Sequence, residues 1–153
     1  MIGKETTAVW LLTGAVAGVL AGAIMGILSQ LGYRAGYVKS HLIAIDGAFV
    51  LRTLRRGTGP RAVYVAGVLT HLVTSAVFGA AYLGIASVAG VNPRQALPVA
   101  LYTSALWLAM LVVALPVAGQ GFLGRRLRSP VWLEQLVLHV IFGTGLWWAI
   151  GAL

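Results

Sequence analysis

Apolar residues gather in four long runs along this chain, and the short segments between the runs hold nearly all of the charged residues. A helix of about 20 apolar residues is long enough to cross the hydrocarbon core of a bilayer. No water is available there to hydrogen-bond the backbone, so such a run must be helical. The predicted membrane spans cover approximately residues 9–31, 62–88, 97–117 and 131–152.

The composition supports this interpretation. Of the 153 residues, 59% are hydrophobic and only 9% are charged, whereas a soluble domain carries about 25% charged residues. We therefore predict that residues 1–153 form a single membrane domain. Its predicted fold class is all-α: a polytopic protein built as a bundle of four transmembrane helices.

Charge between the spans predicts how the chain is oriented. Six lysines and arginines lie in the segment 33–61 and three lie in the segment 118–130, whereas Lys4 and Arg94 are the two basic residues on the opposite side. Basic loops stay in the cytoplasm. We therefore expect both basic segments to be cytoplasmic and both termini to lie outside. Despite its net charge of +8, the chain is not expected to bind nucleic acid, because no basic domain remains outside the spans.

The first cytoplasmic segment is too long for a tight turn. Within it, residues 40–56 are apolar with a basic end, which favours an amphipathic helix lying at the membrane interface. The alternative is a loop helix tucked into the bundle, with no role beyond packing. Asp46 falls among the apolar residues of this segment and would need a partner.

Glycine recurs every fourth residue in the first span, at Gly14, Gly18, Gly22 and Gly26. Such a stripe of small residues lets another helix approach closely. The stripe therefore predicts helix packing, against either a helix of this chain or one of another subunit.

Two histidines lie within predicted spans. His71 follows Arg61 by ten residues and His139 follows Arg128 by eleven, which places both about 15 Å deep at about 1.5 Å per helical residue. The two spans run parallel, so the histidines share a depth and could converge. The residues predicted to line a site between them on the same helix faces are Gly67, Ser75, Gln135 and Gly143.

This histidine pair has several interpretations. The two imidazoles could be axial ligands of a b-type haem, or they could bind a metal ion or a quinone head group. They could also relay protons, because histidine titrates near neutral pH. Alternatively, each could simply hydrogen-bond a neighbouring helix. Which metal would be bound, if any, is left open.

Glu134 is the only acidic residue within a span, about one turn inside the start of the fourth. It could form an ion pair with the nearby basic loop and favour the helix dipole. The alternative is a carboxylate on a proton pathway leading toward Gln135 and His139.

The segments HLVTSAVFGAAYLG, LVVALPVAGQGFLG and HVIFGTG resemble an uncharacterised family of small four-helix prokaryotic integral membrane proteins. His71 with Gly79 and His139 with Gly143 match the histidine and glycine positions of that family. The resemblance implies a four-helix fold in a prokaryotic inner membrane, and it implies no activity. The third span often carries another histidine in the family, but this chain has Trp107 there, so a three-histidine metal site is not expected.

No catalytic constellation is present, and an activity of the chain's own is not expected. The leading hypothesis is an accessory subunit of a larger membrane complex, of a respiratory or other energy-converting kind, whose partners are the bilayer and other membrane subunits or further copies of itself. The alternatives are an electron-transfer protein that binds haem b, a metal or a quinone through its histidines, and a small channel or transporter.

Overall fold

The computed structural model describes residues 4–57, 59–127 and 130–153, and for residues 4–6 it describes the backbone alone. Helices joined by loops make up the whole of this described part. The elements are α1 (Lys4–Arg34), α2 (Leu42–Thr53), α3 (Pro60–Ala89), α4 (Ala96–Ala109), a π-helical turn η1 (Met110–Ala114), α5 (Leu115–Val117), a 3₁₀ turn η2 (Phe122–Gly124) and α6 (Val131–Ala152).

Four helices of the described part are long and apolar enough to cross a membrane. They cover Thr7–Arg34, Pro60–Ala89, Ala96–Val117 and Val131–Ala152. The prediction of an all-α chain with four long apolar helices is therefore confirmed. Each predicted span lies within one of these helices.

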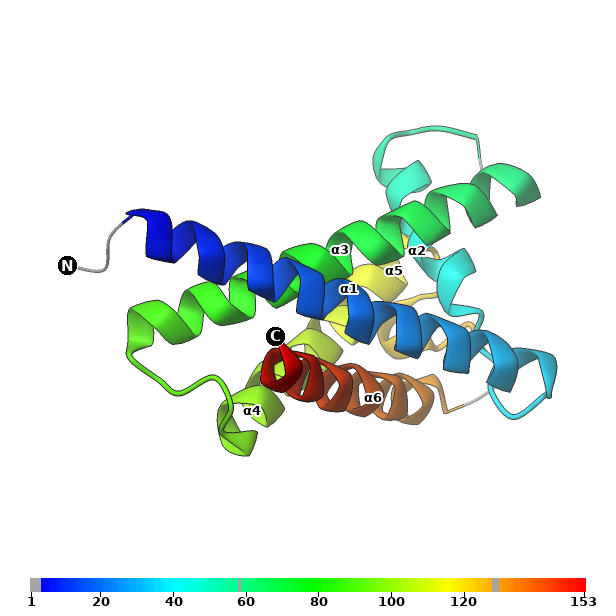
Figure 1. Cartoon of the computed structure of the whole chain (residues 1–153). Coiled ribbons are helices and arrows are strands. Elements are labelled where there is room, and N and C mark those ends of the chain that lie inside the picture. The colour runs from blue at the N-terminus through cyan, green and yellow to red at the C-terminus, as the bar shows by residue number, and fades with distance from the viewer. Residues whose placement is uncertain (1–3, 58, 128–129) are drawn as a thin grey trace.

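Neighbouring long helices contact one another in the order α3, α1, α6 and α4, with α1 between α3 and α6 (Figure 1), and α4 lies across a gap from α3. α1 packs along both α3 and α6, and α4 packs on α6, whereas α3 and α4 share no extended interface. The start of α1 and the end of α3 lie at one end of the molecule (Figure 1). The last turn of α1 and the first turns of α3 and α6 lie at the other end (Figure 1), which brings Arg34 and Arg61 to the same end.

The glycine stripe lies in the contact between α1 and α3. A Cβ added at Gly18 would lie 2.1 Å from the carbonyl oxygen of Ser75, and one at Gly79 would lie 2.0 Å from the carbonyl oxygen of Gly14. No side chain fits between backbones that are this close. The helix that the stripe contacts therefore belongs to this chain.

α2 packs against the first half of α3. A Cβ at Gly47 would lie 1.9 Å from the carbonyl oxygen of Val63, and one at Gly67 would lie equally close to that of Ile43. α2 is thus packed closely on α3, and its position at the membrane interface stays a prediction. Its N-cap is His41, whose Nδ1 accepts a hydrogen bond from the backbone N–H of Ala44 at 3.1 Å.

The third long helix changes its winding before it ends. The π-helical turn η1 lies between α4 and α5, and the helix ends at Val117. Pro116 explains this irregularity because it has no N–H and its ring clashes with the carbonyl four residues earlier. A π-helical turn widens the helix locally, and such turns are frequent at functional sites.

Candidate functional site

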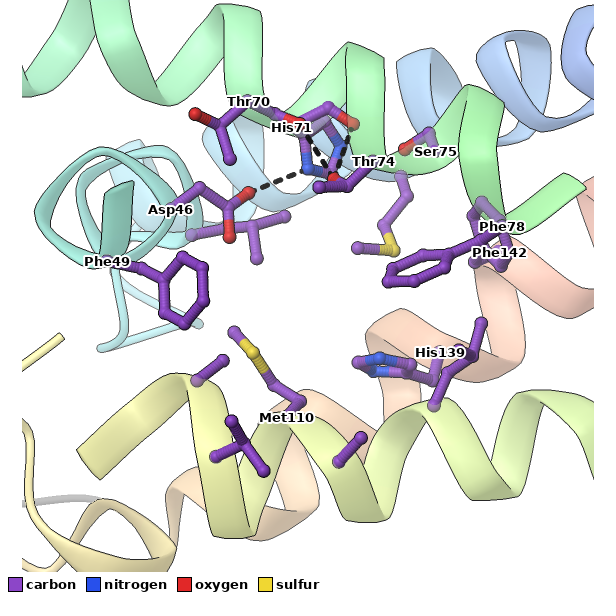
Figure 2. A pocket seen from close by; sticks show the side chains of 16 residues that line it. Asp46, Phe49, Thr70, His71, Thr74, Ser75, Phe78, Met110, His139 and Phe142 are labelled. Atoms are coloured by element: carbon purple, nitrogen blue, oxygen red, sulfur yellow. Dashed lines mark hydrogen bonds and ion pairs between the residues drawn. The ribbon is translucent and has the colours of Figure 1, made fainter. Parts of the chain in front are cut away.

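A cavity of about 220 Å³ lies between α3 and the α4–η1 helix, with α2 at one end and α6 behind it (Figure 2). Most of its walls are apolar. The polar and ionisable residues that line it are Asp46, Thr70, His71, Thr74, Ser75 and His139. Binding sites for small molecules commonly combine such an apolar wall with a few polar groups.

His71 is held from two sides. Its Nδ1 lies 2.9 Å from Oδ2 of Asp46, and its Nε2 lies 2.9 Å from the carbonyl oxygen of Gly22. The glycine stripe therefore has a second consequence: α1 comes near enough for its backbone to contact the imidazole. The side chain of His71 is buried, while that of Asp46 is 17% exposed.

These two contacts determine how many protons the pair holds. A carbonyl oxygen can only accept, so Nε2–H donates to Gly22. The contact at Nδ1 then needs one further proton, which belongs either to an imidazolium facing a carboxylate or to a neutral carboxyl facing a neutral imidazole. In both cases the pair is neutral as a whole, which is the arrangement that a low-dielectric interior favours.

His139 is arranged differently. Its Nδ1 lies 2.7 Å from the carbonyl oxygen of Gln135, one turn earlier in α6, so Nδ1–H donates to that carbonyl. A neutral imidazole then carries its lone pair on Nε2. The ring of His139 lies at the cavity, on the side opposite His71 (Figure 2).

The cavity opens sideways between α3 and the α4–η1 helix. Two of its lining residues, Phe78 and Val113, are 38% and 52% exposed. Ala109 also lines the cavity and is exposed. We call the gap between Phe78 on one side and Ala109 and Val113 on the other the lateral mouth.

The structure places the residues predicted from the sequence in different surroundings. His71, His139 and Ser75 line one cavity. Gly67 instead packs against α2, and a Cβ at Gly143 would lie 2.9 Å from the side chain of Thr103. Neither glycine is among the residues that line this cavity, and both lie at close helix contacts.

Gln135 and Glu134 support the loop before α2. The buried side chain of Gln135 donates from Nε2 to the hydroxyl of Ser40 at 3.3 Å. The carboxylate of Glu134 accepts hydrogen bonds from the backbone N–H groups of Lys39 and Ser40, at 3.0 and 2.9 Å. Neither residue is among those that line the cavity. The place of Glu134 gives the proton-pathway interpretation no support.

A haem held by both histidines does not fit this geometry. Both ring nitrogens of His71 already face an oxygen atom, so neither is available to iron. Within the described part of the chain, no three His, Asp or Glu side chains are grouped so that they could hold a metal ion.

Sequence reasoning missed the contact between Asp46 and His71. The sequence contains an acid in an apolar loop segment and a histidine in the next span, but nothing in their spacing indicates that they meet. The two internal methionines, Met25 and Met110, also line the cavity and were not predicted to do so. Flexible thioether side chains fill irregular cavities and adapt to what binds there.

Comparison of the chain with protein-family models, with curated proteins and with solved structures finds no match. The resemblance to a prokaryotic membrane family therefore stays a prediction, and the candidate site is interpreted from its own chemistry.

Proposed function

We propose that this chain is a four-span protein of a prokaryotic cytoplasmic membrane, and that it binds a small lipid-soluble molecule in the cavity between α3 and α4. The observation that carries the proposal is the lateral mouth, through which a partly polar cavity opens onto an apolar surface. A ligand dissolved in the bilayer could enter there without passing through water.

Exposed side chains support placement in a membrane. Large apolar residues are exposed along all four long helices, for example Leu12, Leu69, Leu101 and Val140, each at 58–67%. Such a surface would aggregate in water and is suited to lipid. The positive-inside rule then places the basic end and α2 on the cytoplasmic side, with both termini outside.

The polar groups of the cavity support a ligand rather than a role in packing alone. Nε2 of His139 and the second oxygen of Asp46 have no hydrogen-bond partner among the described residues, although both side chains line an otherwise apolar space. Neither atom is fully buried, so each is accessible to a partner in the cavity. A ligand with polar hydrogens would satisfy both.

An accessory role in a larger membrane complex is compatible with this proposal. It predicts that the protein co-purifies with larger subunits, and a monodisperse monomer from native membranes would contradict it. The exposed apolar faces of the long helices leave room for such partners. Binding of a ligand in the cavity can be tested on the isolated chain.

The test is extraction of small molecules from protein purified in mild detergent from its own membrane, followed by mass spectrometry. The wild type is expected to carry one lipid-soluble compound at close to one molecule per chain. Ala109→Trp should block the lateral mouth and reduce that amount at least tenfold. Leu108→Trp is the matched control because Leu108 is exposed but does not line the cavity. Equal amounts in both variants would contradict the proposal.

A further inference from the structure

We propose that the cavity takes the head group of a quinol, a single aromatic ring with hydroxyl groups at opposite positions and a lipid tail. This inference rests on the proposed function and names the ligand class of the same site. It follows from the positions of protons around the cavity, from the size of the cavity and from its mouth.

The first argument is that Asp46 offers an acceptor in either protonation state of its pair with His71. When the carboxylate is ionised, both oxygens accept hydrogen bonds. When it is neutral, the proton lies on Oδ2, which faces His71, and Oδ1 remains a carbonyl oxygen. Figure 2 shows Oδ1 on the cavity side of the residue. A ligand group that contacts Oδ1 must therefore donate.

The second argument is that His139 offers an acceptor from the other side. Its N–H is committed to the carbonyl of Gln135, which leaves the lone pair of Nε2 for the cavity. The hydroxyl of Thr74 already donates to the carbonyl of Thr70 at 2.7 Å, whereas the hydroxyls of Thr70 and Ser75, which also line the cavity, can either donate or accept. Two acceptors on opposite walls match a ligand that has two donors at opposite ends.

Size and shape select a single ring. An engineered cavity of about 150 Å³ in another protein holds one benzene molecule. This cavity, at about 220 Å³, has room for a benzene ring with several small substituents, but not for a macrocycle. Phe49 and Phe142 extend into it from two elements (Figure 2), and aromatic rings pack well against one another. The lateral mouth would let a tail pass into the bilayer.

The oxidised ring fits less well. A quinone has carbonyl oxygens where the quinol has hydroxyls, so it brings lone pairs toward Asp46 and His139 and donates nothing. A site built to hydrogen-bond a hydroxyl discriminates strongly against an analogue that lacks it, because the polar groups of the site are then left unpaired. We expect the reduced ring to bind at least tenfold more tightly than the oxidised one.

The experiment compares duroquinol with duroquinone, which differ only by two hydrogens. Binding is measured by equilibrium dialysis under argon, with the full chain in nanodiscs and with empty nanodiscs as the blank. At least tenfold tighter binding of duroquinol is expected for the wild type, a result that needs no variant. His139→Phe should remove the preference, and Val140→Phe, on the exposed face of α6, should keep it.

Three outcomes would overturn the inference. If both rings bind equally and Ala109→Trp abolishes binding of both, the cavity binds ligands without distinguishing hydroxyls from carbonyls. Only the proposed function then survives. If neither ring binds although the purified protein carries another compound, the ligand class is wrong and the proposed function again survives. If neither ring binds and no compound co-purifies, both proposals fail.

Discussion

The two sides of α3 show opposite ways of joining helices. On the side facing α1, the backbones touch, and the carbonyl oxygen of Gly14 lies 2.0 Å from where a Cβ of Gly79 would be. On the side facing α4, the helices stay apart and leave a cavity of about 220 Å³. The hydroxyl of Tyr102 closes one end of this gap by donating to the carbonyl of Phe78 at 2.7 Å.

This difference has a cause in the sequence. One face of α3 presents small residues, Ser75 and Gly79, to the glycine stripe, and the adjacent face presents Thr74 and Phe78 toward α4. Tight packing on the first side holds His71 still, because a glycine carbonyl of α1 contacts its ring. The tight contact between α1 and α3 thus supplies rigidity, and the gap between α3 and α4 supplies space for a ligand.

The largest loss of stability is expected for a change at His71, which contacts α1 and also lines the cavity. His71→Leu removes the partner of Asp46 and leaves a mostly buried carboxylate unpaired. We expect a loss of about 3 kcal/mol in the free energy of unfolding. Titration of the protein with a denaturing detergent, followed by circular dichroism, measures it.

The matched variant is Asp46→Asn. Its amide can donate to Nδ1 of a neutral His71 while Nε2–H still donates to Gly22, so we expect a loss below about 1 kcal/mol. Equal losses for His71→Leu and Asp46→Asn would show that the pair does not hold the fold as described.

A single added methyl group should disrupt the close contact between α1 and α3. Gly79→Ala places a Cβ against the backbone of α1, which cannot move aside without separating the helices. A loss of about 2 kcal/mol in the free energy of unfolding is expected. Gly84→Ala is the control in the same helix, because its Cβ would meet only the end of the Leu11 side chain, at 3.2 Å. A Gly79→Ala protein as stable as this control would refute close backbone packing.

A substitution at the end of the gap that Tyr102 closes should cause a smaller loss of stability. Tyr102→Phe removes the hydroxyl that donates to the carbonyl of Phe78. We expect a loss of about 1 kcal/mol, the usual contribution of one hydrogen bond. Amide hydrogen exchange of the residues around Phe78 should accelerate as well. Unchanged exchange would mean that another contact closes this end.

The smallest effect on stability is expected at His139. The only hydrogen bond of its side chain among the described residues is to its own helix, and the ring borders the cavity. His139→Phe should therefore change the free energy of unfolding by less than about 1 kcal/mol, while ligand binding falls at least tenfold. A large loss of stability together with unchanged binding would reverse the roles assigned to the two histidines.

Much of the fold could be predicted from the sequence because bilayer physics allows few solutions. Long apolar runs predict helices, and a glycine repeat predicts close packing. The histidines of α3 and α6 were placed at one depth by counting residues along parallel helices, and they do line one cavity.

The remaining features depend on tertiary contacts that no periodicity encodes. The position of α2 brings Asp46 to His71. The roles of Gly67 and Gly143 could not be separated from a lining role, because a small residue suits both a pocket wall and a helix contact. The packing order of the long helices, which leaves a gap between α3 and α4, likewise cannot be predicted from any single segment.

The most direct test of the central claim uses the chain with ¹⁵N-labelled histidines in nanodiscs. Nε2 of His139 should give the resonance of an unprotonated nitrogen, and Nε2 of His71 that of a protonated one. Adding duroquinol should move the Nε2 resonance of His139 and leave that of His71 in place. A protonated Nε2 at His139, or a spectrum that duroquinol leaves unchanged, would contradict a ligand site built on the free nitrogen of His139.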